Sequence, residues 1–247
     1  MKVLITGASG LIGGECLKQC LSHPSVAVVV AFVRCSLASE ISAHPKLKQV
    51  IIEDFAKWPQ GHFEGTLRCC GDHMTTSDSD SSNGRTRAMG TYRGSPTADF
   101  DCPLGFLRSM APVLEAESKV EKGYPFRYIQ LSGKFTRGDQ DKKLWFMECP
   151  RKLKGPCDVR ILEFADAHKD SWKISVVKPG AVGTETMLGT RMASAIMGSN
   201  WSVLIEEVGA FMTYLVVDGA GESAVVENGR IVQRGREILQ SQLQSHS

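Results

Sequence analysis

Short apolar runs alternate with longer amphipathic stretches along this chain. Residues 26–33 form a continuous run rich in β-branched side chains, which is typical of a parallel strand buried on both faces. The alternation of strands with helices predicts an α/β protein with a doubly wound parallel sheet. The pattern predicts strands at 3–6, 26–33, 46–52, 126–131 and 173–177, helices at 11–21, 143–168 (interrupted by prolines) and 203–217, and a late strand pair at 224–233 around Glu227-Asn228-Gly229.

The first apolar run ends in a glycine-rich turn. Residues 3–13 read V-L-I-T-G-A-S-G-L-I-G, in which Gly7 permits a tight turn and Gly10 lets backbone approach a pyrophosphate. The phosphates would lie at the positive end of the helix that follows, and Gly13 lets this helix pack closely on the strand. A purely structural turn is the alternative, but the strand before it and the helix after it favour a dinucleotide site in a Rossmann fold. The predicted contacts are Thr6, Gly7, Ser9, Gly10, Leu11, Ile12 and Gly13.

One stretch departs from the strand–helix pattern. A fourth strand is expected between residues 65 and 99, yet residues 69–87 read C-C-G-D-H-M-T-T-S-D-S-D-S-S-N-G-R-T-R. A structureless loop of that length is uncommon inside a compact domain. We therefore interpret residues 66–87 as a disordered insertion, with a gene-model error or a functional lid as alternatives. Residues 88–91, A-M-G-T, resemble the end of the missing strand and its glycine loop.

Composition argues against several functional classes. The 247 residues include 29 basic and 27 acidic side chains, a net charge of +2, which gives no nucleic-acid or membrane signal. No apolar run is long enough to span a bilayer, and the N-terminal residues do not have the pattern of a signal peptide. The eight cysteines show no C-x-x-C pair, so we expect reduced thiols in a cytoplasmic protein and no metal site.

The length is that of a single α/β domain spanning residues 1–247. We expect a small C-terminal substrate lobe at about residues 181–217. Its mixture of Met, Ala and Gly with Trp201 suggests an apolar pocket without identifying a ligand.

The ends of the second and third strands indicate which dinucleotide binds. NAD enzymes commonly carry an acidic residue after the second strand, whereas an Arg there suits the 2′-phosphate of NADP. Arg34 occupies this position, and Ser36 adds a second donor. Asp54 is placed to accept a hydrogen bond from an adenine amino group, with Phe55 beside it. We therefore predict NADP as cofactor, with a solvated Arg34 as the alternative.

These motifs together resemble the short-chain dehydrogenase/reductase superfamily. The T-G-A-S-G-L-I-G turn, V-R-C-S, E-D-F, the A-M-G-T loop, L-S-G after the fifth strand and K-P-G after the sixth carry the resemblance. The glycine spacing is that of the extended and atypical branches. Within them, the chain is most similar to Tat-interacting-protein reductase-like and fungal nucleoside-diphosphate-sugar epimerase-like proteins. The resemblance implies further cofactor contacts at Gly90, Thr91, Pro179 and Gly180.

The family's catalytic unit is a Ser followed by Tyr-x-x-x-Lys on the next helix. The Tyr transfers the proton, the Lys tunes the Tyr and holds the nicotinamide ribose, and the Ser polarises the substrate oxygen. Ser132 matches the family's Ser and Lys154 its Lys, but Pro150 stands where the Tyr belongs. We take Ser132 and Lys154 as candidate catalytic residues. A turn hydroxyl and a solvated helix cation are the alternatives.

Three functions follow from this partial match. The first is an oxidoreductase that reduces a small carbonyl or unsaturated metabolite, with Ser132, water or the substrate handling the proton. The second is an NADP-binding regulator or interaction module with little turnover, which the missing Tyr favours. The third is a non-redox isomerase or cyclase that uses the same pocket. The fold alone does not separate them, and the oligomeric state stays open.

Overall fold

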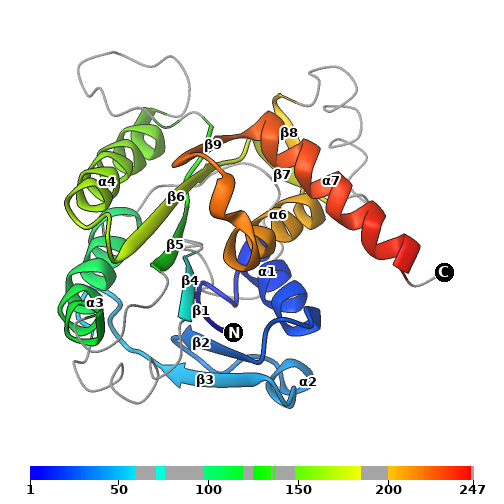
Figure 1. The fold of residues 1–247 in the computed structure, drawn as a ribbon, viewed down its shortest axis with the longest axis horizontal. Helices are drawn as coiled ribbons and strands as arrows, with labels where there is room; N and C mark the ends of the chain where they lie inside the picture. The colour runs from blue at the N-terminus through cyan, green and yellow to red at the C-terminus, as the bar shows by residue number, and fades with distance from the viewer. Residues whose placement is uncertain are drawn as a thin grey trace.

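The computed structural model describes residues 1–58, 71–75, 97–118, 125–134, 136, 148–184 and 200–245. Within these, seven strands form one sheet in the order β3-β2-β1-β4-β5-β6-β9, and each pairs with its neighbours in parallel (Figure 1). The chain order reverses between β1 and β4, which is where doubly wound folds bind nucleotides. The strands are β1 Lys2–Thr6, β2 Val28–Val33, β3 Leu47–Ile51, β4 Gly71–Thr75, β5 Phe126–Leu131, β6 Trp172–Lys178 and β9 Val225–Glu227.

Helices cover both faces of this sheet (Figure 1). Successive side chains of β1 point to opposite faces of the sheet, and both faces are apolar. Val3 and Ile5 belong to the core beneath α1 and α6, whereas Leu4 belongs to the core beneath α3 and α4. α7 packs outside α6. The helices are α1 Leu11–Ser22, α2 Ser39–Ser42, α3 Cys102–Ser118, α4 Glu148–Ala167, α6 Ile205–Val217 and α7 Asn228–Ser245. The fold therefore confirms the predicted doubly wound α/β architecture.

The interpretation of residues 66–87 as a disordered insertion is wrong at residues 71–75, which form β4. This strand lies between β1 and β5, where Thr75 pairs with Thr6 and with Gln130. Its sequence, G-D-H-M-T, lacks the apolar run that usually identifies a central strand, and this hid it. The rest of 66–87, and residues 88–91, lie outside the described residues.

The predicted late strand pair is also wrong. Only Val225–Glu227 is a strand (β9), and α7 begins at Asn228. Asn-Gly is a common hairpin signal, but here the Asn side chain is fully buried at the start of α7.

The substrate lobe expected at about residues 181–217 stays a prediction. Ten of the residues in α6 are buried, and most of them are apolar. The helix therefore packs on α1 and on the sheet. Residues 181–183 and 202–204 form a separate two-stranded parallel sheet, β7 Ala181–Gly183 and β8 Ser202–Leu204. Residues 185–199 lie outside the described residues.

Pro150 and Pro156, expected to interrupt the helix at 143–168, lie inside α4. Pro150 is in its first turn, where no backbone N–H is required. Residues 143–147 are not described. None of the helices in the described ranges has the length and apolar character needed to cross a bilayer.

Candidate functional site

The glycine turn has the geometry that its sequence predicts. Gly7 adopts a positive φ of 72°, in the left-handed region that favours glycine. The N–H of Gly10 donates to the Gly7 carbonyl at 2.9 Å, and the N–H of Gly14 donates to the Gly10 carbonyl at 2.8 Å. Gly10 is the N-cap of α1, whose first turn contains no acidic side chain.

The turn therefore joins the end of β1 to the N-terminus of α1 beside the reversal point of the sheet. Ser9 and Leu11 are exposed there, Ile12 is half-buried, and Thr6 and Gly13 are buried. The N–H groups of the first helical turn are available for an anion.

Arg34 and Asp54 lie around the N-terminus of α3. Both act on the Cys102 thiol, whose pKa is raised to about 11 by burial and by Asp54, while Arg34 opposes the shift. Arg34 and Ser36 are exposed after β2, and Asp54 is exposed after β3. The structure thus brings Arg34 and Asp54, which are 20 residues apart in the chain, to one region.

The side chains after β3 also serve the local fold. One carboxylate oxygen of Asp54 accepts a hydrogen bond from the Ala56 N–H at 2.9 Å. The Phe55 ring meets Trp58 edge-on, with 5.4 Å between centroids. Phe55 also packs against the core beneath α3.

Ser132 contacts a buried carboxylate. Its hydroxyl donates to Asp158 Oδ2 at 2.7 Å, and Thr136 donates to the same oxygen at 3.1 Å. The Lys178 ammonium lies 3.3 Å from that oxygen. These side chains come from the end of β5, the loop after it, α4 and the end of β6. Asp158 therefore ties together two strand ends and a helix.

Lys154 forms a second ion pair one helical turn earlier on α4. Its Nζ lies 3.5 Å from Oδ1 of Asp99, a side chain with no exposed surface. The nearby Cys157 thiol has its pKa raised to about 12, first by burial and then by Asp158 and Asp99. Cys157 is therefore protonated at neutral pH and is not an activated nucleophile.

The described tyrosines do not replace the missing Tyr. Tyr128 is fully buried in β5, where its hydroxyl donates to Gln130 Oε1 at 2.8 Å. Tyr214 belongs to α6, on the opposite face of the sheet from α4. Tyr92 and Tyr124, with the predicted contacts Gly90 and Thr91, lie outside the described residues.

The loop after β6 is closely packed. Pro179 is buried, and its carbonyl accepts a hydrogen bond from the Lys134 N–H at 2.8 Å. A Cβ at Gly180 would collide with the Trp201 carbonyl. The Gly180 N–H donates to Asn228 Oδ1 at 2.7 Å, and the Asn228 amide donates to the Ser202 carbonyl at 3.0 Å. Asn228 thus holds the Pro179–Gly180 loop against β8.

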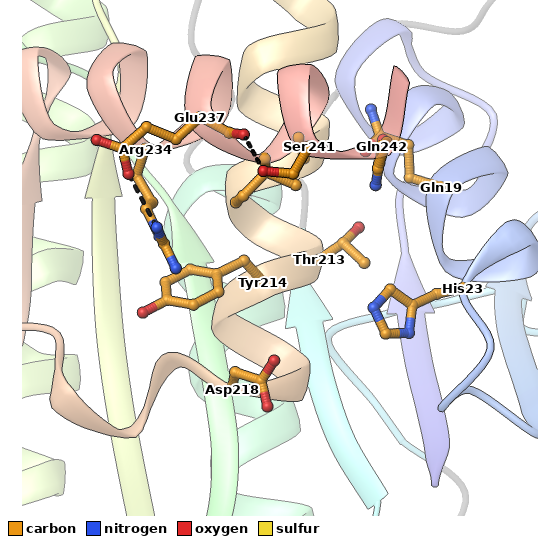
Figure 2. Close-up of a pocket in the computed structure, with 11 residues that line it drawn as sticks. Gln19, His23, Thr213, Tyr214, Asp218, Arg234, Glu237, Ser241 and Gln242 are labelled. Carbon is orange, nitrogen blue, oxygen red and sulfur yellow. Dashed lines mark hydrogen bonds and ion pairs between the residues drawn. The ribbon is translucent and has the colours of Figure 1, made fainter. Parts of the chain in front are cut away.

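A cavity of about 340 Å³ lies away from this site, between α1, α6 and α7 (Figure 2). Arg234 lines one side of it, paired with Glu237 at 2.8 Å and lying 4.7 Å from the centre of the Tyr214 ring. None of the predicted cofactor contacts lines it. The cavity is therefore distinct from the candidate cofactor site.

The sequence reasoning missed Asp99 and Thr136, and assigned no role to the side chains of Asp158 and Lys178. One signal was available, because Lys154 and Asp158 are four residues apart and so share a helix face. The pairings with Ser132, Lys178 and Asp99 join segments distant in the chain and left no local pattern. Within the described residues, no cluster of three potential metal ligands is present.

Comparison with solved structures identifies the fold. The carbonyl reductase Sniffer of D. melanogaster superposes with a TM-score of 0.64 at 15% identity, covering 92% of this chain and 96% of its own. A short-chain dehydrogenase from Burkholderia cenocepacia in complex with NADP gives a TM-score of 0.60 at 15% identity, covering 99% and 94%. The fold is that of the short-chain dehydrogenases and reductases. At this identity the similarity establishes the fold alone.

Comparison by sequence is less specific. No family model matches the chain. A nonribosomal peptide synthetase, inpA of Emericella nidulans, is 25% identical over 214 residues, which is 74% of this chain. The match spans 14% of the length of that relative.

Proposed function

We propose that this chain is an NADP-dependent oxidoreductase of the short-chain dehydrogenase type that reduces a small carbonyl or unsaturated metabolite. The observation that carries the proposal is the turn at Gly7, which presents the N-terminus of α1 beside the reversal point of a Rossmann sheet. Two solved structures with the same fold, a carbonyl reductase and a short-chain dehydrogenase in complex with NADP, add support.

The residues present fit such a cofactor. The N–H groups at the start of α1 would hold the pyrophosphate, since the first turn of the helix has no acidic side chain to oppose it. Arg34 and Ser36 would hold a 2′-phosphate, and Asp54 an adenine amino group. The backbone of Pro179 and Gly180 would flank the nicotinamide. When bound, NADPH supplies a hydride.

Lys154 is less free than the family pattern implies. Because its ammonium pairs with buried Asp99, a contact to the nicotinamide ribose would have to share that charge. The hydroxyl proton of Ser132 is likewise directed at Asp158. These two contacts favour, as a second candidate function, an NADP-binding protein with little turnover.

Arg34 should determine the choice of cofactor. We expect NADPH to bind at least about tenfold more tightly than NADH, because a charge-assisted contact between Arg and phosphate contributes about 1.5–3 kcal/mol. Arg34→Ala should remove this preference and leave the NADH affinity nearly unchanged. Fluorescence titration with each dinucleotide measures both effects.

Arg160→Ala is a matched control, because Arg160 is exposed on α4 and pairs with Glu163 on the same helix. This variant should keep the preference for NADPH. Equal affinities of the unmodified protein for the two cofactors would refute the NADP assignment. Absence of binding to either would refute the proposed function.

A further inference from the structure

Carbonyl reduction at the carboxyl ends of β5 and β6 would require a proton donor. Reducing a carbonyl adds a hydride to carbon and a proton to oxygen. The family's Tyr would supply that proton, but Pro150 occupies its position. A substitute must present an ionisable hydrogen near Ser132.

Ser132 does not meet this requirement by itself. A serine hydroxyl has a single hydrogen to donate, and here it is donated to Asp158 Oδ2 at a distance of 2.7 Å. Thr136 also directs its hydroxyl at acceptors, the Gly133 carbonyl at 2.9 Å and Asp158 at 3.1 Å. In this arrangement both hydroxyls hold the carboxylate, and neither has a hydrogen for a substrate oxygen.

The Lys178 ammonium can donate more than one hydrogen bond. An ammonium carries three N–H donors, and among the described residues its contact is with Asp158 Oδ2 at 3.3 Å. Lys178 Nζ and Ser132 Oγ contact the same oxygen, so one small functional group can reach both. The side chain is 18% exposed, which lets the amine regain a proton from water.

The backbone also places Lys178 correctly. It is the last residue of β6, next to β5, and it directly precedes the Pro179–Gly180 loop predicted to flank the nicotinamide. In model peptides lysine and tyrosine side chains titrate at about 10.4 and 10, so an ammonium is about as good a proton donor as the phenol it would replace.

We propose that Lys178 is the proton donor of this site and that Asp158 is its positioning residue, an inference that rests on the proposed function. The hydride supplied by NADPH forms a C–H bond at the carbonyl carbon. The π electrons of the C=O bond move to oxygen, which forms an O–H bond as an N–H bond of Lys178 breaks. The product is an alcohol, the cofactor is oxidised to NADP⁺, and the neutral amine then takes a proton from water.

Substitution of Lys178 tests the proposal, with NADPH and 4-nitrobenzaldehyde as probes. Lys178→Met should lower kcat by about 100-fold or more, because loss of a positioned acid removes about 10²–10⁴-fold of rate. Lys178→Arg keeps the positive charge but cannot release a proton, so its kcat should fall similarly. The Kd for NADPH should stay within about twofold in both variants, since the contacts expected at the start of α1 and at Pro179–Gly180 are made by backbone groups.

Lys169→Met serves as the control, because Lys169 is exposed and pairs only with nearby Asp166 among the described contacts. It should reduce the aldehyde at the unmodified rate. The proposal is overturned if Lys178→Met or Lys178→Arg retains the unmodified kcat, or if the unmodified chain binds NADPH without reducing the aldehyde. Failure to bind NADPH at all is a different result, which refutes the proposed function itself.

A second measurement needs no cofactor. Asp158 holds the Lys178 ammonium at 3.3 Å, so Asp158→Asn should release this side chain toward solvent and speed acetylation of Lys178 by acetic anhydride. Mass spectrometry of the digested full chain gives this rate relative to that of Lys169 in the same sample. Unchanged relative labelling would show that Asp158 does not control Lys178, and would overturn its assignment as the positioning residue.

Discussion

Lys154→Met is expected to lower the free energy of unfolding by about 3 kcal/mol. The reason is Asp99, whose side chain has no exposed surface and lies 3.5 Å from the Lys154 ammonium. Removing one partner of a buried ion pair typically costs about 3–5 kcal/mol, because the buried charge loses that part of its compensation. Because Lys154 itself is 18% exposed, we place the loss at the lower end of that range. Urea denaturation followed by circular dichroism measures it.

A double variant separates this cause from lost packing. Asp99→Asn removes the negative charge that pairs with Lys154. The double variant should therefore lose less unfolding free energy than the sum of the losses of the two single variants. Arg160→Met breaks an ion pair whose partners are 65% and 56% exposed, and it should change stability by no more than about 0.5 kcal/mol. Similar losses of unfolding free energy for Lys154→Met and Arg160→Met would show that the Lys154–Asp99 ion pair does not stabilise the fold.

This prediction changes how the match to the family's Lys is interpreted. In the family pattern the Lys holds the nicotinamide ribose and tunes a Tyr. Here the residue four positions earlier is Pro150, and a buried carboxylate holds the ammonium. The ion pair with Asp99 gives Lys154 a structural role on α4 that needs no Tyr, and it leaves the acid to a residue on another element.

The sequence predicted those parts of the fold whose signal is local. Val28–Val33 is buried on both faces, so its apolar run is continuous, and the turn at Gly7 requires glycine for a φ of 72°. β4 was missed because it occupies the centre of the sheet with a polar sequence. Its place is set by pairing with β1 and β5, which no local pattern records.

In the candidate site, too, some features could be predicted from the sequence and others could not. Gly10, Arg34 and Ser132 follow strand ends, and the carboxyl ends of parallel strands meet at one edge of a sheet, so the sequence could place them together. The partners of Ser132 and Lys154 could not be inferred, since Asp158 and Asp99 reach them only after α4 has packed on the sheet. Resemblance to a family suggested which residues form the candidate site, and the packing determines what each of the described ones contacts.

Asn228 shows how a correct local signal can mislead. Asn-Gly is common in hairpin turns because both residues tolerate a positive φ. In this chain the same dipeptide begins α7, and the Asn side chain is fully buried. Its amide group accepts a hydrogen bond from the loop after β6, at Gly180, and donates one to β8, at Ser202.

Asn228→Ala is therefore expected to lower the free energy of unfolding by roughly 2–4 kcal/mol. The change removes the Asn228 hydrogen bonds of the half-buried Gly180 N–H and of the buried Ser202 carbonyl, and an unsatisfied buried group costs about 1–3 kcal/mol. Affinity for NADPH should fall as well, because the Pro179–Gly180 loop loses the contact that fixes it against β8. Urea denaturation and fluorescence titration of the same preparation measure the two effects.

Gln240→Ala is the matched control, because Gln240 is an exposed amide on the same helix. It should leave both the unfolding free energy, within about 0.5 kcal/mol, and the NADPH affinity unchanged. If Asn228→Ala lost stability but bound NADPH as tightly as Gln240→Ala, the loop after β6 would not contribute to the cofactor site. Loss of both properties would instead connect the buried amide, through Gly180, to the end of the sheet where Lys178 and Ser132 lie.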